Sequence, residues 1–340
     1  MKIIYVDMQF YYGKKEWGIN YIGQDGFLKS MINLGHHVEP FYYDDYLDRT
    51  DLLQDELSKF ADEKKPDLIF FSLYTDQFQH DTLDYLKSKY TTIAWFGDDI
   101  WRFDNYSKYY ATYFTYCITT DKFSISKYKD IGQDKIIYSQ WAGIESRQDN
   151  KKDNYKYDIS FIGMKNEYRE WFVDEMKKRS INIVTFGKGW KNGIIDNDEM
   201  NRIFLLSRIN LNLPNSDSFD MRYLLETKFK SFFNQEISRK RMIKSILFKK
   251  NTLKDMIRLY NNSDLLSILK SPKNLDGIKA RIFEITYIGG FALSYYSSGI
   301  EDYYNIGKEI ICFKEIDEAE ILIKYYLKEE EWKQKLRRRN

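Results

Sequence analysis

Two cations and a carboxylate stand close together late in the chain, at Lys279, Arg281 and Glu284. The segment Lys279–Ile288 spaces its apolar residues along one helical face, which predicts a helix that begins at these charges. The amino end of a helix attracts anions through its free N–H groups, and neighbouring cations strengthen that attraction. A carboxylate one turn later can accept hydrogen bonds from a pair of hydroxyls. The amino end of this helix thus suits a ligand that carries phosphate and ribose.

The residues after this helix predict a turn followed by two short buried strands, at Phe291–Ser294 and Ile310–Phe313. Gly289-Gly290 ends the helix, because a C-terminal cap needs a residue that tolerates positive φ. We count Gly290 and Glu301 among the candidate ligand-binding residues, although Glu301 can equally cap the turn in which it stands. Such a helix–turn–strand unit is common in α/β proteins, so a purely structural interpretation stays open.

Apolar runs and helical patterns alternate through the first half of the chain. Strands are expected at Lys2–Val6, His37–Tyr42, Pro66–Leu73, Thr92–Phe96, Tyr113–Thr119 and Lys135–Tyr138. This alternation predicts βαβ units and an open, doubly wound sheet, in which ligands bind beyond the carboxyl ends of the strands. The polar residues that directly follow strands are Asp7, Thr75, Asp76, Asp98, Asp99 and Asp121.

The segment Trp95–Asp99, with sequence WFGDD, is the most suggestive of these strand ends. Asp98 and Asp99 can cap the next turn, or act as a catalytic base or an acceptor for sugar hydroxyls. His80, in the loop after the third strand, is a second base candidate.

Aromatic residues crowd the loop between Asp7 and Gly23. They are Phe10, Tyr11, Tyr12, Trp17 and Tyr21. They can stack on sugar rings at the mouth of a domain or simply pack beneath a long loop, and the sequence favours neither interpretation.

The second half repeats the pattern after a polar linker at Trp141–Lys156. A strand runs into Gly163, and another ends before Gly187 and Lys188. Glycines at these positions let backbone approach a ligand, and Lys188 can meet a phosphate. We expect two Rossmann-like domains, at residues 1–145 and 156–328.

Residues 215–275 interrupt the second domain. Met221–Leu275 holds 13 Lys and Arg against 4 Asp and Glu, whereas the whole chain has a net charge of +2. Its helical spacing of apolar residues predicts a basic helical insertion. This insertion either covers the second domain or contacts an acidic membrane or anionic acceptor. We expect no nucleic-acid partner, because basic helices without a recognised module are poor evidence for one.

The composition excludes several classes of protein. Cys117 and Cys312 form no disulfide framework, Met1–Phe10 lacks the features of a signal peptide, and no apolar run is long enough to cross a membrane. We therefore expect a cytoplasmic protein. No group of His, Cys, Asp or Glu has the spacing of metal ligands. Asp196–Asp198 matches the DxD metal motif, but we discount it because it falls at an expected helix cap. The last residues lie within an expected helix, so we expect the full protein to extend further.

Two stretches resemble the CgeB-like (spore-maturation-type) glycosyltransferases. Lys279–Phe313 resembles their C-terminal signature, with Arg281, Phe283 and Glu284, then Gly-Gly, then Gly-Lys-Glu before an apolar strand. Trp95–Asp99 with Trp101–Phe103 resembles their N-terminal domain. The resemblance covers nearly the whole chain except residues 215–275.

The resemblance implies the GT-B fold, with two Rossmann-like domains facing across a cleft, and transfer of a sugar from a UDP- or GDP-linked donor. The acceptor would be a glycan, lipid or protein, as in polysaccharide biosynthesis. The donor would bind Gly163, Gly187, Lys188, Lys279, Arg281, Glu284, Gly290 and Glu301. The first domain would hold the acceptor with Asp98, Asp99 and the Gly13–Gly23 loop, and a carboxylate there would be the catalytic base if the enzyme inverts; His80 stays a separate base candidate from its position after the third strand. Fixed cations can stabilise the diphosphate leaving group without a metal or cofactor.

Two alternatives stay open. In the first, the chain is a non-catalytic protein that binds a nucleotide sugar or an acidic surface. In the second, it is another α/β enzyme, such as an epimerase that acts on UDP-sugars. Pairing of Arg281 with Glu284 far from any crevice between the domains would contradict the glycosyltransferase assignment.

Overall fold

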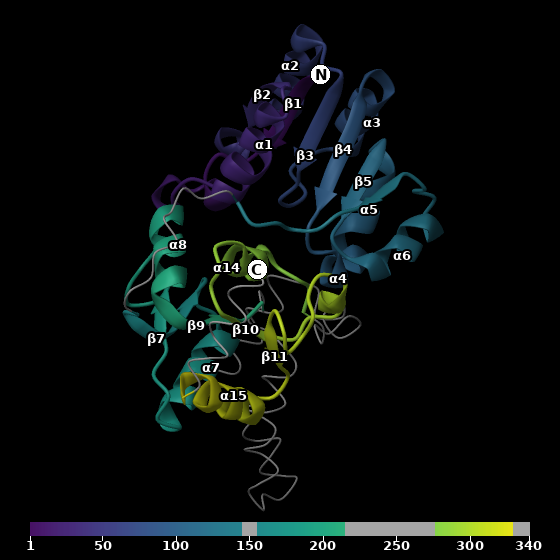
Figure 1. Ribbon diagram of the computed structural model, residues 1–340. Coiled ribbons are helices and arrows are strands. Elements are labelled where there is room, and N and C mark those ends of the chain that lie inside the picture. Colours follow the sequence, from purple (N-terminus) through teal and green to yellow (C-terminus); the bar gives the residue numbers. More distant parts are fainter. Residues whose placement is uncertain (145–154, 215–275, 329–340) are drawn as a thin grey trace, which may run out of the picture.

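The computed structural model contains two separate parallel β-sheets, each covered by helices on both faces (Figure 1). It describes residues 1–144, 155–214 and 276–328. We call residues 1–144 the first lobe, and residues 155–214 together with 276–328 the second lobe. The expected basic insertion at 215–275 lies outside the described residues.

The first lobe is built on a six-stranded parallel sheet of order β2-β1-β3-β4-β5-β6. Its strands are β1 (Lys2–Asp7), β2 (His37–Tyr42), β3 (Leu68–Ser72), β4 (Thr91–Phe96), β5 (Tyr116–Thr119) and β6 (Ile136–Tyr138). Its α-helices are α1 (Lys29–Asn33), α2 (Thr50–Lys64), α3 (His80–Lys89), α4 (Asp99–Arg102), α5 (Lys108–Tyr110) and α6 (Ile125–Asp130). The chain order doubles back at β1, as in a doubly wound sheet.

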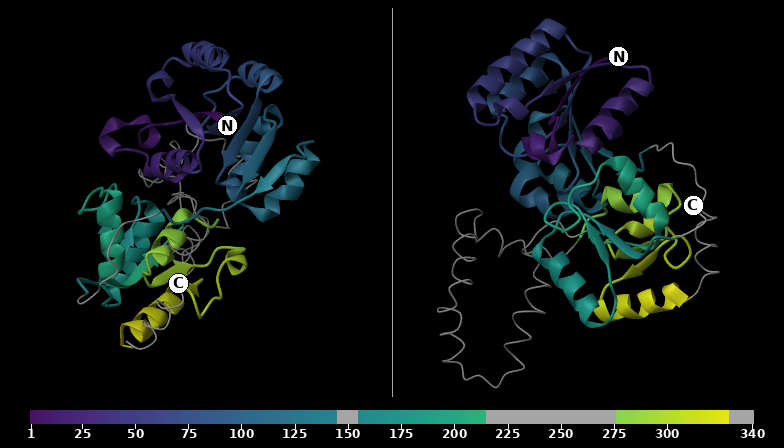
Figure 2. Two further views of the ribbon diagram at one scale, coloured as in Figure 1. Left: turned by 45° about the horizontal axis from the view of Figure 1, so that its top comes forward. Right: turned by 90° about the vertical axis from the view of Figure 1, so that its left-hand side faces the viewer.

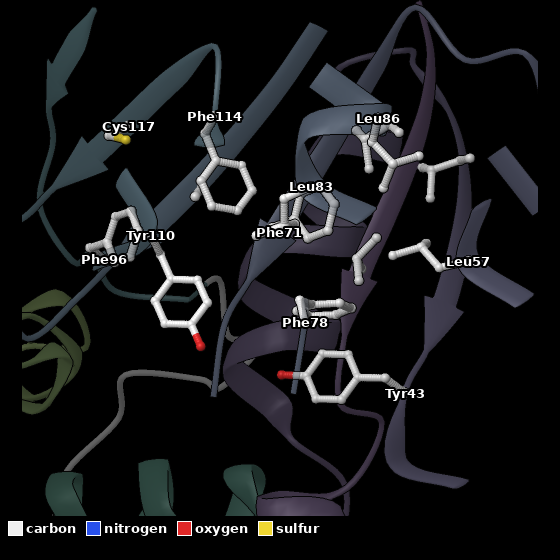
Figure 3. Close-up of a cluster of buried hydrophobic side chains, with 14 of the residues drawn as sticks. Tyr43, Leu57, Phe71, Phe78, Leu83, Leu86, Phe96, Tyr110, Phe114 and Cys117 are labelled. Atoms are coloured by element: carbon white, nitrogen blue, oxygen red, sulfur yellow. The ribbon is translucent and has the colours of Figure 1, made fainter. Parts of the chain in front are cut away.

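The two faces of this sheet bury different apolar clusters. Leu57 of α2 and Leu83 and Leu86 of α3 pack with Phe71 and Cys117 on one face (Figure 3). On the opposite face, Tyr5, Phe70 and Trp95 pack against residues of α1 and its approach. Burial on both faces explains why the strands are almost continuously apolar.

The second lobe is built on a five-stranded parallel sheet of order β11-β10-β9-β7-β8. Its strands are β7 (Tyr157–Ile162), β8 (Val184–Phe186), β9 (Ser207–Asn212), β10 (Ala292–Tyr295) and β11 (Ile311–Phe313). Its α-helices are α7 (Glu167–Lys178), α8 (Asn197–Leu206), α14 (Ala280–Tyr287) and α15 (Ile316–Lys328).

The helices of the second lobe divide between its two faces. Phe172 of α7 and Ile323 of α15 share one buried cluster, whereas Phe204 of α8 and Ile282 and Ile285 of α14 belong to another. In Figures 1 and 2, α14 lies toward the first lobe and α15 lies on the far side. The fold therefore brings α14 to the boundary between the lobes.

Most sequence expectations about single elements are confirmed. Strand β2 has the expected bounds, and α14 begins one residue after the expected Lys279. Strand β5 begins at Tyr116 and not at Tyr113, because residues Ala111–Tyr113 form a 3-10 turn that leads into the strand. The helices α4, α5 and α6 were not expected, because they are short and carry little periodic signal.

Gly187 gives a test of how closely two loops of the second lobe approach. It has φ +119°, and a Cβ there would stand 2.4 Å from the Gly163 carbonyl oxygen. Gly193 also has positive φ, but a Cβ there would meet nothing within 4 Å. We expect Gly193→Ala to cost about 1 kcal/mol of stability, and Gly187→Ala about 2 kcal/mol more, because it adds a backbone clash.

Urea unfolding of both variants measures this difference. Equal losses of stability would contradict the close contact between the loops after β7 and β8.

Candidate functional site

The carboxyl ends of strands from both sheets meet at the boundary between the lobes. A small cavity there is lined from both sides, by Gly97, Ile100, Thr120, Asp121, Lys122 and Tyr138 of the first lobe and Gly277, Ile278, Ser298 and Gly299 of the second. Gly97 follows β4 and Thr120 follows β5. This boundary is where a doubly wound architecture places a ligand.

Arg281 and Glu284 form an ion pair that reaches the first lobe. Arg281 Nη1 lies 2.6 Å from Glu284 Oε2, and the Tyr21 hydroxyl of the first lobe donates to Glu284 Oε1 over 2.6 Å. Glu284 is 4% exposed. Burial works to lower the pKa of Arg281, but the adjacent Glu284 carboxylate and the Tyr21 and Tyr11 hydroxyls outweigh it, so the pKa lies above its usual value. The pair is therefore a charge site at the lobe boundary, with a buried carboxylate and a partly buried guanidinium.

Lys279 makes a second ionic contact across the boundary. Its ammonium group pairs with the Asp98 carboxylate at the end of β4. Both side chains are partly buried, so water screens this pair less than it would a surface pair. This pair thus joins a candidate donor-binding residue of the second lobe to a candidate acceptor-binding residue of the first.

Arg169 belongs to the same site and was missed in the sequence. It lies in the first turn of α7, where its guanidinium donates to the backbone oxygens of Leu213 and Met164. Burial and, second to it, the positive charge of Arg281 lower the pKa of Arg169 to about 10. Two arginines that repel each other at a lobe boundary favour a bound anion. A lone Arg in an amphipathic helix gives no sequence signal of this.

Lys188 also faces the first lobe. Its Nζ lies 2.8 Å from the centroid of the Trp17 ring, which belongs to the aromatic loop after β1. Lys188, which we expect to contact a phosphate, is therefore held over an aromatic face in this structure.

The candidate glycines serve the packing of the lobe. The Gly163 N–H donates to Phe186 O, and its carbonyl accepts from Trp190 Nε1 and lies close to Gly187. Gly290 lies at the opposite end of α14 from Lys279, near the amino end of β10. A Cβ at Gly290 would stand 2.9 Å from the Ile285 carbonyl oxygen. The tight turn between α14 and β10 therefore explains why a glycine is needed here.

Three other expected site residues do not join this group. Asp99 is 1% exposed and accepts a 2.7 Å hydrogen bond from Tyr128, so its side chain points into the first lobe. His80 begins α3 and stacks on Tyr113 with ring centroids 4.1 Å apart. Glu301 is exposed and accepts a 2.6 Å hydrogen bond from the Tyr296 hydroxyl.

Within residues 1–144, 155–214 and 276–328, no three His, Cys, Asp or Glu side chains converge as a metal site requires. Over the same residues, no helix is both long enough and apolar enough to cross a bilayer.

Comparison with protein families gives one match. Residues 248–340 match the model of a family described as Glycosyl transferase-like, which is about a quarter of the chain. The matched range contains α14 and the Arg281–Glu284 pair. No curated protein matches the chain.

Solved structures show the same fold at very low sequence identity. Sucrose-phosphate synthase from Thermosynechococcus elongatus has 7% identity and a TM-score of 0.57, over 99% of this chain and 92% of that one. The catalytic domain of starch synthase IV from Arabidopsis thaliana, bound to ADP and acarbose, has 8% identity and a TM-score of 0.56, over 99% and 94%. HepE from Anabaena, in complex with UDP-glucose, has 11% identity and a TM-score of 0.55, over 99% and 92%. The fold of this chain is therefore the GT-B arrangement of two facing Rossmann-like lobes, as expected.

Asp99 gives a pH-dependent test of its buried position. Burial raises the pKa of its carboxyl to about 6, above a value of about 3.9 in the unfolded chain. Between these pH values the native state binds more protons than the unfolded state, so this group's contribution to stability falls as pH rises from about 4 to beyond 6. Asn does not titrate, so Asp99→Asn should gain about 1 kcal/mol relative to wild type between about pH 5 and pH 7.5.

Urea unfolding of both proteins at the two pH values measures this gain. Burial also raises the pKa of the Asp7 carboxyl to about 6, but that residue is common to both proteins and cancels in the comparison. A stability difference that does not change with pH would contradict a titrating, buried Asp99.

Proposed function

We propose that this protein is a glycosyltransferase that moves a sugar from a nucleoside-diphosphate donor to an acceptor bound by the first lobe. The observation that carries the proposal is the site at the amino end of α14. There, the buried Glu284 carboxylate with its partner Arg281, and the nearby Arg169, meet the first lobe. The GT-B fold and the Glycosyl transferase-like match over residues 248–340 support it.

The second lobe would hold the donor. Arg281 and Arg169, with Lys188 and Lys279, would neutralise the diphosphate, which gains charge as it leaves the sugar. Glu284 would accept hydrogen bonds from the two ribose hydroxyls in place of the Tyr21 hydroxyl that it binds here. In this proposal the cations of the chain, and not a bound metal, balance the developing charge.

The first lobe would hold the acceptor, with Asp98 as the carboxylate that takes the proton of the attacking hydroxyl. Asp98 is the only one of the three expected catalytic candidates for which the described residues show a contact with the second lobe, through Lys279. Asp99 would hold the first lobe together, through Tyr128, and His80 would pack α3.

The finer parts of the proposal rest on the sequence. The resemblance to CgeB-like enzymes suggests a UDP- or GDP-linked donor and a cell-surface glycan, glycolipid or protein as acceptor. The free thiols of Cys117 and Cys312 favour a reducing compartment such as the cytoplasm. A peripheral contact with an acidic membrane would fall to the basic segment 221–275, which lies outside the described residues.

A second candidate function is nucleotide-sugar binding without turnover. The observation that favours it is that Arg281 and Lys279 already have protein partners, Glu284 and Asp98. Hydrolysis of a nucleotide sugar by the wild-type protein, and its loss in Glu284→Ala, would support the enzyme. Tight binding with no hydrolysis or transfer would support the binding protein.

The donor site predicts binding of nucleoside diphosphates. UDP, GDP or ADP should raise the melting temperature of the wild-type protein, because a ligand that binds only the native state stabilises it. Arg281→Met should weaken the binding about 10- to 100-fold, since a hydrogen bond to a charged group contributes about 1.5–3 kcal/mol. Calorimetric titration measures the affinities.

Arg202→Met is the matched control, because Arg202 also belongs to the second lobe but is exposed and pairs with Glu199 on α8. It should bind nucleotide as the wild type does. If none of the three nucleotides stabilises the wild-type protein, the proposed donor site is wrong.

The hydrogen bond from Tyr21 to Glu284 leads us to expect that substitution of Tyr21 raises the affinity for nucleotide. Its hydroxyl occupies a Glu284 oxygen that the ribose would need, so Tyr21→Phe should tighten nucleotide binding by up to about tenfold. Tyr303→Phe is the control, because the Tyr303 hydroxyl also makes a contact between the lobes, but with Tyr138 and not with Glu284.

Calorimetric titration of both variants separates the two explanations. Tighter binding in Tyr21→Phe alone indicates competition for Glu284. An equal gain in both variants would mean that only the opening of the lobes matters.

A further inference from the structure

The ring of Trp17 is held between the two lobes. It lies in the loop after β1, within the short 3-10 helix Lys15–Trp17, and Lys188 of the second lobe stands over it with Nζ 2.8 Å from the ring centroid. Lys14 of its own loop also contacts the ring, at 4.7 Å. Lys188 thus contacts this aromatic face from the opposite lobe.

Trp17 is part of an aromatic cluster, which we call the ring shelf and define as Tyr12, Trp17 and Tyr74. Tyr12 meets Trp17 edge-on at 5.5 Å between centroids and meets Tyr74 edge-on at 5.6 Å. Tyr12 is 44% exposed although it is a large aromatic residue. The shelf therefore offers aromatic surface that the core of the lobe does not bury.

The backbone at Tyr12 is strained. It has φ 53° and ψ 31°, in the left-handed region that a bulky residue seldom adopts. Such strain persists only where the surroundings impose it, and it occurs often at ligand sites. Here the loop is fixed by Asp44, whose carboxylate accepts from the Gln9 N–H at 2.6 Å and the Phe10 N–H at 3.0 Å. The loop thus holds Tyr12 in a costly conformation at an exposed position.

The ring shelf lies beside the charged site. The hydroxyl of Tyr12 interacts electrostatically with Asp98, the proposed base, and with Arg169. Lys188, which covers Trp17, follows Gly187 at the end of β8 and is one of the cations proposed for the diphosphate. One ammonium group therefore has two alternative partners, an aromatic face and a phosphate.

We propose that the ring shelf is the binding platform for a sugar ring of the acceptor, and that Lys188 covers the Trp17 face of this platform until a donor diphosphate draws it away. The inference rests on the proposed function and deepens it, because it names a saccharide as the acceptor class and sets the order in which the two substrates bind.

The chemistry of the parts supports this order. A full negative charge attracts an ammonium group more strongly than the quadrupole of an aromatic ring does, so a diphosphate competes successfully for Lys188. The uncovered indole then presents a flat apolar face, which suits the C–H face of a pyranose. Asp98 nearby can accept from a sugar hydroxyl. An acceptor sugar would thus find its platform only when the donor is in place, which suppresses unproductive binding.

The first experiment measures the exposure of Trp17 by acrylamide quenching of tryptophan fluorescence, with and without UDP, GDP or ADP. The chain has 7 Trp, so the Trp17 signal is taken as the difference between wild type and Trp17→Phe. We expect that signal to become more quenchable on nucleotide binding. In Lys188→Met it should be fully quenchable without nucleotide, whereas Lys191→Met, a control at the exposed lysine of the same loop, should behave as wild type.

Thermal stabilisation in the same samples separates the two levels of the argument. Stabilisation by a nucleotide with no change in Trp17 quenching would overturn the inference and leave the proposed donor site intact. No stabilisation by any of the three nucleotides would overturn the proposed function and the inference with it.

The second experiment tests the saccharide class on an array of immobilised glycans. Wild type should bind glycans with UDP or another stabilising nucleotide present, and about tenfold or more weakly without it. Lys188→Met should bind without nucleotide, and Trp17→Ala should bind in neither case. Glycan binding by wild type that ignores nucleotide overturns the covering role of Lys188. The absence of any glycan binding by wild type with nucleotide present overturns the saccharide assignment.

Discussion

The ion pair between Arg281 and Glu284 is the constraint on which the boundary between the lobes depends. A buried charge must be matched by another charge and by hydrogen bonds, or the cost of removing it from water is not recovered. Glu284 meets this requirement with Arg281 on its own helix and with the Tyr21 hydroxyl of the first lobe. Lys279, the residue just before this helix, pairs with Asp98 of the first lobe. Because the pair needs a partner from the first lobe, the geometry of α14 and the docking of the lobes are parts of one arrangement.

Much of the fold follows from the sequence because the strands are buried on both faces. Continuous apolar runs such as the one at β3, bounded by polar loops, leave few alternatives to a covered parallel strand. The exceptions are local. Helices α4 and α5 are only four and three residues long and lack a periodic pattern. The start of β5 depends on a 3-10 turn that its apolar residues conceal.

The candidate site was predictable only in part. The positions of Lys279, Arg281 and Glu284 at the start of a helix were visible as a charge pattern. Arg169 was not, because its interest comes from its electrostatic interaction with Arg281, a residue far away in the sequence. Conversely, Asp98 and Asp99 are neighbours in the sequence with opposite fates. The turn after β4 directs Asp98 to the second lobe and buries Asp99 against Tyr128.

The nearness of Arg169 and Arg281 has a consequence for how this protein can evolve. Their mutual repulsion is an energy that the fold tolerates before any ligand arrives, so the electrostatic field for an anion is set in advance and needs no rearrangement. A natural variant that neutralises residue 169 but keeps its hydrogen bonds to the Leu213 and Met164 carbonyl oxygens would lose that repulsion, and with it part of the field for the anion. Selection for stability and selection for the proposed anion site therefore oppose each other at this position, as they do wherever function depends on a destabilising charge.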